Sequence, residues 1–107
     1  MKEVKYDKAV ILYLDELTDT LIEKEYFSFY DTSVEYIWDL ISFVKNNINS
    51  LPHKKAPAYF SKYGKKLFYI SYNRNQRTTW YILFEKTNAH FLIRYITNNH
   101  IAGQYFQ

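Results

Sequence analysis

Three short runs of aromatic and β-branched residues decide the fold: LFYISYN at residues 67–73, WYILFE at 80–85 and FLIRYIT at 91–97. Each run has the length of a strand and is rich in the residue types that favour strands. Only the polar links NRNQRTT and KTNAH separate them. Runs with this spacing are predicted to form an antiparallel meander.

Two amphipathic helices are predicted before these strands. The first, over residues 7–25 with Asp7 as its N-cap, has apolar residues at spacings of four, three and four, namely Val10, Leu14, Leu17 and Leu21, widened by Ile11 and Ile22. The second begins at Thr32, which forms a capping box with Glu35, and ends before Pro52. Its stripe is Val34, Ile37, Ile41, Val44 and Ile48, with Trp38 and Phe43 adding aromatic bulk.

The order of these elements predicts the fold class. Residues 2–6 are a candidate edge strand, and FSFYD (27–31) is a short connection between the helices. Helix, helix and then three strands is an α+β pattern, in which the helical hairpin packs on one face of a small antiparallel sheet. A chain of 107 residues has room for one core, so a single domain over residues 1–107 is expected.

The two halves of the chain carry opposite charge. Residues 1–51 hold 5 Lys and 10 Asp or Glu, a net of −5, whereas residues 52–107 hold 9 Lys or Arg and the single acid Glu85, a net of +8. A strongly basic half is typical of a surface that binds a polyanion. The alternative is that the two halves neutralise each other where they pack.

Several kinds of chemistry are excluded by composition. There is no Cys, and only two Gly residues are present, so a thiolate metal site and a Gly-rich phosphate loop are not possible. The three histidines show none of the usual ligand spacings, and neither a metal nor another cofactor is expected. The apolar runs are too short to span a bilayer, so no membrane contact and a cytoplasmic location are expected.

The remaining candidates are basic and aromatic. A basic loop over residues 53–66 holds Lys54, Lys55, Lys62, Lys65 and Lys66, and Arg74, Arg77 and Arg94 follow it among Tyr69, Tyr72, Trp80, Tyr81 and Tyr95. Basic residues neutralise phosphates and aromatic rings stack on unpaired bases. The alternative for each ring is that it is buried in the hydrophobic core. Arg94 interrupts an apolar strand and therefore needs an anion, either an acidic side chain from a helix or a ligand.

Two motifs give the layout a family resemblance. HIAGQY directly after FLIRYITNN places His100 five residues before Tyr105, and YGKKLFYISYN leads a basic stretch into a strand. In these motifs and in the order of its elements, the chain resembles the RelE/ParE superfamily of toxins from type II toxin–antitoxin modules. The resemblance implies a RelE/ParE-like fold with a basic concave face. The resemblance in the order of elements extends over nearly the whole chain, whereas the matching motifs are short.

The resemblance implies functional roles as well. Ribonuclease members of the family enter the ribosomal A site and cut mRNA without a metal, so that translation stops. Carried over by position, His100 would be the acid/base and Tyr105 would assist, with Arg94 stabilising charge. The expected RNA-binding residues are Lys62, Lys65, Lys66, Arg74 and Arg77.

The sequence also departs from the family. Ile101 stands where an Arg is common, and Asn99 replaces the small residue before the histidine. A ParE-like toxin that inhibits DNA gyrase by binding, and a degenerate non-toxic relative, are therefore alternatives. The ribonuclease and the gyrase-inhibiting toxin both imply a small antitoxin, encoded by the adjacent gene, that covers the sheet or its groove with an acidic segment.

Overall fold

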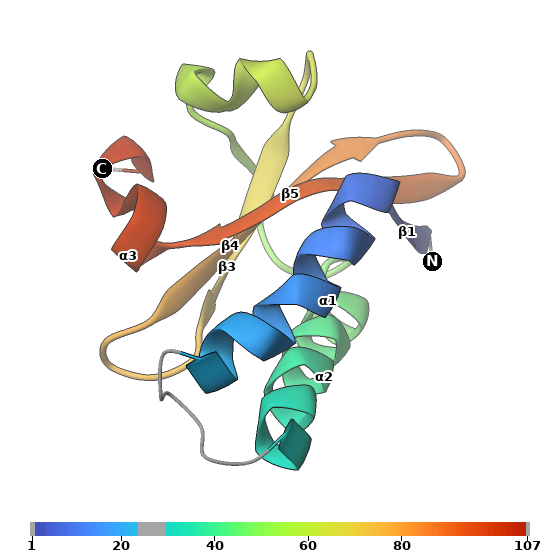
Figure 1. Cartoon of the computed structure of the whole chain (residues 1–107). Coiled ribbons are helices and arrows are strands. Elements are labelled where there is room, and N and C mark those ends of the chain that lie inside the picture. The colour runs from blue at the N-terminus through green and yellow to red at the C-terminus, as the bar shows by residue number, and fades with distance from the viewer. Residues whose placement is uncertain (1, 24–29, 107) are drawn as a thin grey trace.

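The three aromatic runs form neighbouring strands of one sheet (Figure 1). In the computed structural model of the chain, which describes residues 2–23 and 30–106, they are β3 (Phe68–Asn73), β4 (Thr79–Lys86) and β5 (His90–Asn98). β4 lies between the other two and pairs antiparallel with both. The predicted meander is confirmed, and each strand begins and ends within one residue of the prediction.

Two further strands make the sheet mixed, so the prediction of an antiparallel sheet is wrong in this respect. β2 (Lys54–Lys55) pairs antiparallel with β3, but β1 (Glu3–Tyr6) pairs parallel with β5, and the strand order is β1-β5-β4-β3-β2. Parallel neighbours need a long connection between them. Here the whole of both helices and three strands separates β1 from β5, so no tight turn sets their relative direction.

The predicted helical hairpin covers one face of this sheet (Figure 1). α1 (Lys8–Glu23) begins after Asp7, whose Oδ1 accepts a hydrogen bond from Ala9 N at 3.1 Å, so the predicted N-cap is confirmed. The predicted end of this helix at residue 25 and most of the connection lie outside the described residues. The predicted α+β class, with a helical hairpin on a sheet, is therefore confirmed.

The predicted start of the second helix is wrong. α2 (Tyr30–Asn47) is already helical at Tyr30, so Thr32 lies inside it and not at an N-cap, and the capping box with Glu35 does not mark its beginning. Tyr30 and Asp31, which precede Thr32, are therefore part of the helix.

The core between hairpin and sheet is built from the apolar stripes of both helices. Val10, Leu14 and Leu17 of α1, Val44 of α2 and Ile48, just after the end of α2, are buried there, as their spacing predicts. The strands present alternate residues to the same core, among them Ile70, Ile82, Ile93 and Ile96. This face of the sheet therefore accounts for most of the buried apolar surface.

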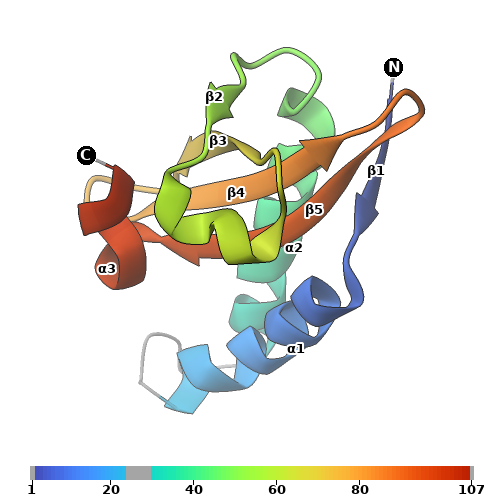
Figure 2. The same ribbon diagram turned by 90° about the horizontal axis from the view of Figure 1, so that it is seen from above.

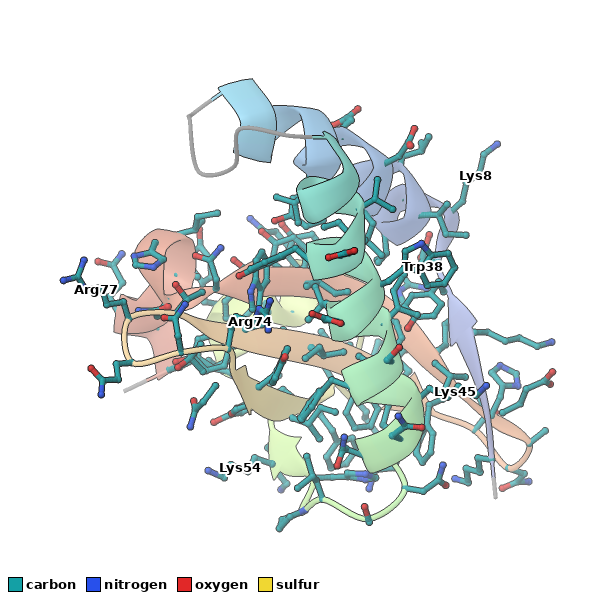
Figure 3. The ribbon with its side chains drawn as sticks, turned by 90° about the horizontal axis from the view of Figure 1, so that it is seen from below. Lys8, Trp38, Lys45, Lys54, Arg74 and Arg77 are labelled. Carbon is teal, nitrogen blue, oxygen red and sulfur yellow. The ribbon has the colours of Figure 1, made fainter. Side chains whose placement is uncertain are left out.

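Two apolar residues that the sequence places in or beside the helical stripes lie outside this core. Trp38 is 61% exposed and Ile11 is 55% exposed, and both line an apolar cleft of 390 Å³ between α1 and α2. Figure 3 shows Trp38 projecting from α2. Trp38 and Ile11 lie beside the buried stripe, at the outer margin of a two-helix layer, where neither helix has a neighbour to cover them.

The opposite face of the sheet is covered by two short segments (Figure 2). The predicted basic loop folds instead into β2 and a 3₁₀ helix, η1 (Ala58–Tyr63), and the C-terminal segment forms α3 (Asn99–Ala102) and η2 (Gly103–Phe106). Phe60, Leu67, Leu83 and Ala102 are buried between these segments and the sheet. The second face therefore carries its own small core.

Two half-buried tyrosines are expected to lower the stability of the fold at alkaline pH. Burial raises the pKa of Tyr6 and of Tyr13 to about 12. Because the folded state favours the neutral phenols, their contribution is complete below pH ~10, the unfolded pKa, and is lost as pH rises towards 12. Both side chains retain contact with solvent, so we expect a loss of only roughly 1 kcal/mol each at pH ~11.

Urea unfolding followed by circular dichroism at pH 8 and pH 11 measures this loss. Tyr6→Phe and Tyr13→Phe remove the titrating hydroxyls, so each variant should lose less stability than the wild type between the two pH values. Variants that lose as much as the wild type would contradict the assignment.

Candidate functional site

The link between β3 and β4 is a rigid turn that carries two of the predicted site arginines at its ends. Arg74 N donates to Thr78 O at 2.9 Å, which closes the turn. Asn75 Oδ1 accepts hydrogen bonds from the backbone N–H groups of Arg77 and Thr78 at 2.9 and 3.0 Å. An Asn side chain that satisfies amides two and three residues on is typical of such turns. These hydrogen bonds therefore define the backbone conformation of the link.

Two asparagines attach the C-terminal helix to this link. Asn98 is the N-cap of α3, and its Oδ1 accepts from the backbone N–H groups of His100 and Ile101 at 2.9 and 3.2 Å. Asn99 Oδ1 accepts from Thr79 N at 2.9 Å, and its Nδ2 donates to Arg77 O at 3.0 Å. Asn99, which departs from the family pattern, therefore sets the position of α3 relative to the link.

His100 is brought to the link by this arrangement. It is exposed, and its Nε2 lies 3.0 Å from Thr78 Oγ1. Arg77, the preceding residue of the link, is also exposed and projects outward in Figure 3. In the part of the chain that the structure describes, neither His100 nor Arg77 forms an ion pair with a carboxylate. We call His100, its hydrogen-bond partner Thr78 and Arg77, the residue before Thr78 in the chain, the His100 cluster.

Tyr105 lies against a different element. Its ring stacks on Tyr59 of η1, with centroids 3.6 Å apart and planes 7° apart. A hydrogen bond with Tyr105 raises the pKa of Tyr59. Lys62 Nζ lies 5.0 Å from the Tyr59 ring centroid, within the range of a cation–π contact. The structure therefore places Tyr105 and Lys62 together as parts of an aromatic stack.

Arg94 occupies a bulge in β5. Leu83 pairs with Tyr95 and Phe84 pairs with Ile93, which leaves Arg94 as an extra residue opposite one step of β4. A bulge bends the strand and redirects a side chain. It allows an arginine to interrupt an apolar strand without entering the main core.

The anion beside Arg94 is internal. Its Nη1 lies 3.4 Å from Asp7 Oδ2 and 3.5 Å from Glu85 Oε1, and its Nε donates to Tyr63 O at 2.8 Å. Of the two alternatives left open by the sequence, the structure has the acidic side chain, from the start of the first helix. Arg94 therefore ties together α1, β4 and η1.

Removing this guanidinium should destabilise the fold. Arg94→Met leaves two carboxylates and a carbonyl without their partner, and we expect the free energy of unfolding to fall by about 1–3 kcal/mol, the lower end reflecting partial exposure. Urea denaturation measures the difference. Arg77→Met is the matched control, because this arginine is exposed and its loss should change stability by less than ~0.5 kcal/mol. Equal effects of the two variants would rule out the structural role of Arg94.

Arg74 lies on the hairpin side of the sheet. Its Nη2 is 3.3 Å from Asp39 Oδ2 of α2, and its guanidinium carbon is 4.7 Å from the centroid of the Tyr36 ring. Figure 3 shows it beneath α2, away from the outward-pointing Arg77. The structure thus separates two arginines that are three residues apart in the sequence.

Lys65 and Lys66 lie at the other end of β3 from His100. Together with Lys55 they line a pocket of 540 Å³ beside η1. β3 runs from Phe68, just after these lysines, to Asn73, just before the link, so ~17 Å of extended chain separates the two ends. The structure therefore places His100 and Arg77 at one end of β3 and Lys65 and Lys66 in the lysine pocket at the other, and the remaining predicted residues belong to neither group.

Several residues that contact the predicted site residues were absent from the sequence-based predictions. Asn98 had a readable signal, because Asn before a short helix is a common N-cap. Thr78 and Tyr59 had none, since their partners His100 and Tyr105 are 22 and 46 residues away along the chain. Only the packing of the C-terminal segment on the sheet brings these pairs together.

The described residues contain neither a candidate metal site nor a candidate membrane span. Among residues 2–23 and 30–106, no group of three or more His, Asp or Glu side chains is placed to hold a metal ion. In these ranges no helix is both long enough and apolar enough to cross a membrane. No protein-family model, curated protein or solved structure matches the chain.

Proposed function

We propose that this protein is a toxin of a type II toxin–antitoxin module, of the RelE/ParE kind, and that it cleaves ribosome-bound mRNA without a metal. The observation that carries the proposal is the exposed imidazole of His100, which is hydrogen-bonded to Thr78, the residue that follows the exposed Arg77 in the chain. A proton carrier and a cation that offsets developing charge both favour RNA cleavage by a 2′-hydroxyl.

The proposed reaction uses these groups in one displacement. His100 takes the proton of a 2′-hydroxyl, whose oxygen forms a bond to the neighbouring phosphorus while the bond from phosphorus to the 5′ oxygen breaks. Arg77 offsets the charge that develops on the phosphoryl oxygens. The leaving 5′ oxygen takes a proton from water, and the products are a 2′,3′-cyclic phosphate and a 5′-hydroxyl end.

The imidazole needs a defined orientation for this role. When His100 Nε2–H donates to Thr78 Oγ1, the other ring nitrogen, Nδ1, is left as an acceptor that can take the proton. Thr78 is thus a positioning residue in the proposal. Tyr105 belongs to the aromatic stack and Arg94 to the internal ion pairs, so neither supplies chemistry in this scheme.

A second candidate function is inhibition of DNA gyrase by binding. It is favoured by Ile101, which is exposed at the position where the ribonuclease relatives commonly have an Arg. In either case the proposed partner is a small antitoxin whose acidic segment covers the basic side of the sheet, and the proposed location is the cytoplasm, where ribosomes and gyrase are found. A non-toxic relative is the remaining alternative.

Primer extension on a reporter mRNA in a purified translation system tests the proposal. Discrete cuts at the ribosomal A site, absent when ribosomes are omitted, are the expected result. A parallel supercoiling assay with purified gyrase tests the second candidate. Growth arrest and loss of supercoiling without mRNA cuts would replace the ribonuclease by a gyrase inhibitor, and a protein inactive in all three assays would be the non-toxic relative.

A further inference from the structure

The 3₁₀ helix η1 presents a different kind of residue on each of its three sides. Because a 3₁₀ helix has three residues per turn, residues three apart share a side. Phe60 and Tyr63 face the sheet and its second core, whereas Ala58 and Ser61 line the lysine pocket. The third side carries Tyr59, which is 49% exposed, and Lys62 lies near its ring. η1 therefore forms one wall of the pocket while it is anchored by another side.

The pocket combines a cationic rim with an apolar wall. Lys55 comes from β2 and Lys65 and Lys66 from the segment before β3, and none of the residues that line the pocket is acidic. The apolar wall consists of Ala56, Pro57, Ala58, Leu67 and Phe68. The volume of the pocket, 540 Å³, is typical of a site for one small organic ligand. Three cations around one space repel each other unless an anion lies between them.

The absence of a side chain at Gly64 leaves room for the residues packed beside the pocket. A Cβ at Gly64 would lie 3.0 Å from Leu67 Cδ2 and 3.2 Å from Glu85 Cδ, closer than side chains normally approach. Gly64 N donates to Ser61 O at 3.3 Å, which closes the end of η1. Gly64 thus ends η1 with an extended backbone that leads directly into Lys65 and Lys66, which line the same pocket.

We propose that this pocket binds one nucleotide of an RNA strand, with its phosphate on Lys55, Lys65 and Lys66 and its base against the apolar wall. Lysines bind phosphate as point charges, and the flat apolar surface of a base suits a wall of this kind. The ligand class is a nucleoside monophosphate unit. The inference rests on the proposed function for the RNA strand, but it assigns a binding site apart from His100.

The aromatic stack connects the pocket to the His100 cluster. Tyr59 belongs to η1, beside the pocket, and Tyr105 to η2, which follows α3 directly. Cations with an exposed aromatic surface between them are the usual elements of single-strand binding sites. A bound strand runs from the cleavage position at His100 over this stack into the pocket, which holds a nucleotide away from the cut.

Binding of an RNA that cannot be cleaved tests the pocket. A fluorescent 2′-O-methyl dodecamer lacks the attacking hydroxyls, and anisotropy at several salt concentrations gives its affinity. The double variant K65Q/K66Q should bind at least ~10-fold more weakly, with a salt slope reduced by about 0.7 for the one phosphate that is no longer neutralised. Lys55→Gln should weaken binding in the same direction.

The matched control is K8Q/K45Q, which removes the same charge from α1 and α2 on the hairpin side, where both lysines are labelled in Figure 3. It should change the affinity less than ~2-fold at moderate salt, since exposed charges beyond the Debye length are screened. If the control weakens binding as much as K65Q/K66Q does, the effect is one of net charge and the pocket is overturned.

A small ligand tests the pocket without RNA. Uridine monophosphate should shift the NMR amide signals of Gly64 and Leu67, whereas uridine without the phosphate should shift them far less. Shifts that are scattered over the surface, or equal for both compounds, would overturn the nucleotide site. If uridine monophosphate shifts these signals but K65Q/K66Q binds the dodecamer as tightly as the wild type, the pocket binds a free nucleotide. That result would overturn its role in binding an RNA strand.

Failure of the pocket and failure of the ribonuclease give different results. Intact, pocket-dependent RNA binding by a protein that makes no cuts would retain the pocket and reject the ribonuclease. Cuts that depend on His100 together with unchanged RNA binding by K65Q/K66Q would retain the ribonuclease and reject the pocket.

Discussion

Phe60→Ala is expected to lower the free energy of unfolding by about 3–5 kcal/mol, which is much of the stability of a small domain. Phe60 is 1% exposed and is the buried residue by which η1 attaches to the second face of the sheet. Its ring centroid lies 5.0 Å from that of Phe106 and 5.9 Å from that of Tyr95. Truncation therefore opens a cavity shared by η1, β5 and η2.

The variant should also affect the proposed pocket. η1 forms one wall of that pocket, so loosening it should weaken binding of the noncleavable RNA even under conditions where the domain remains folded. Urea denaturation followed by circular dichroism measures stability, and anisotropy measures binding.

Tyr59→Ala provides the matched control for stability. Tyr59 is the adjacent residue on η1, but it is about half exposed, and its loss should cost only about 1 kcal/mol. Phe60→Leu, which retains most of the volume, should fall between the two. A Phe60→Ala variant as stable as Tyr59→Ala would show that η1 is held by its backbone and not by this ring.

His100→Ala is expected to slow mRNA cleavage by about 10²–10⁴-fold, the usual contribution of a general acid or base. The variant removes only the imidazole, because the backbone N–H of residue 100 still donates to Asn98 and α3 keeps its N-cap. Single-turnover cleavage of reporter mRNA on stalled ribosomes measures the rate directly. Stability should change little, since the side chain is exposed.

Neighbouring variants separate chemistry from local structure. Ile101→Ala is the matched control, because Ile101 is 64% exposed on the same short helix, and its rate should stay within ~2-fold of the wild type. Thr78→Val should slow cleavage and change its pH dependence, and Thr78→Ser should restore both. Undiminished cuts by His100→Ala would move the chemistry to Arg77 and the lysines and reject the proposed mechanism.

The strands and helices could be predicted because their signals are local. The aromatic and β-branched runs determine the three central strands, and apolar spacings of three and four determine both helices. The cap of α1 by Asp7 is also local, since donor and acceptor are two residues apart. The start of α2 was missed for the same reason, because a capping motif is compatible with a position inside the first turn.

The surroundings of each site residue could be predicted only in part. His100 and Tyr105 were recognised by their spacing, but this spacing does not reveal that one bonds to Thr78 and the other stacks on Tyr59. The need of Arg94 for an anion follows from its place in an apolar strand. The choice of Asp7 and Glu85 depends on the bulge in β5 and on the position of α1.

By itself, the sequence determined the α+β class, the two main helices, the edge strand and the three central strands, and the separation of an acidic hairpin half from a basic sheet half. The tertiary structure alone decided the parallel direction of β1, the cover on the second face and the distance between the lysine pocket and His100. The physical reason is range. Helix periodicity and turn chemistry act within a few residues, whereas strand direction, bulges and the docking of η1 and α3 depend on contacts between distant segments.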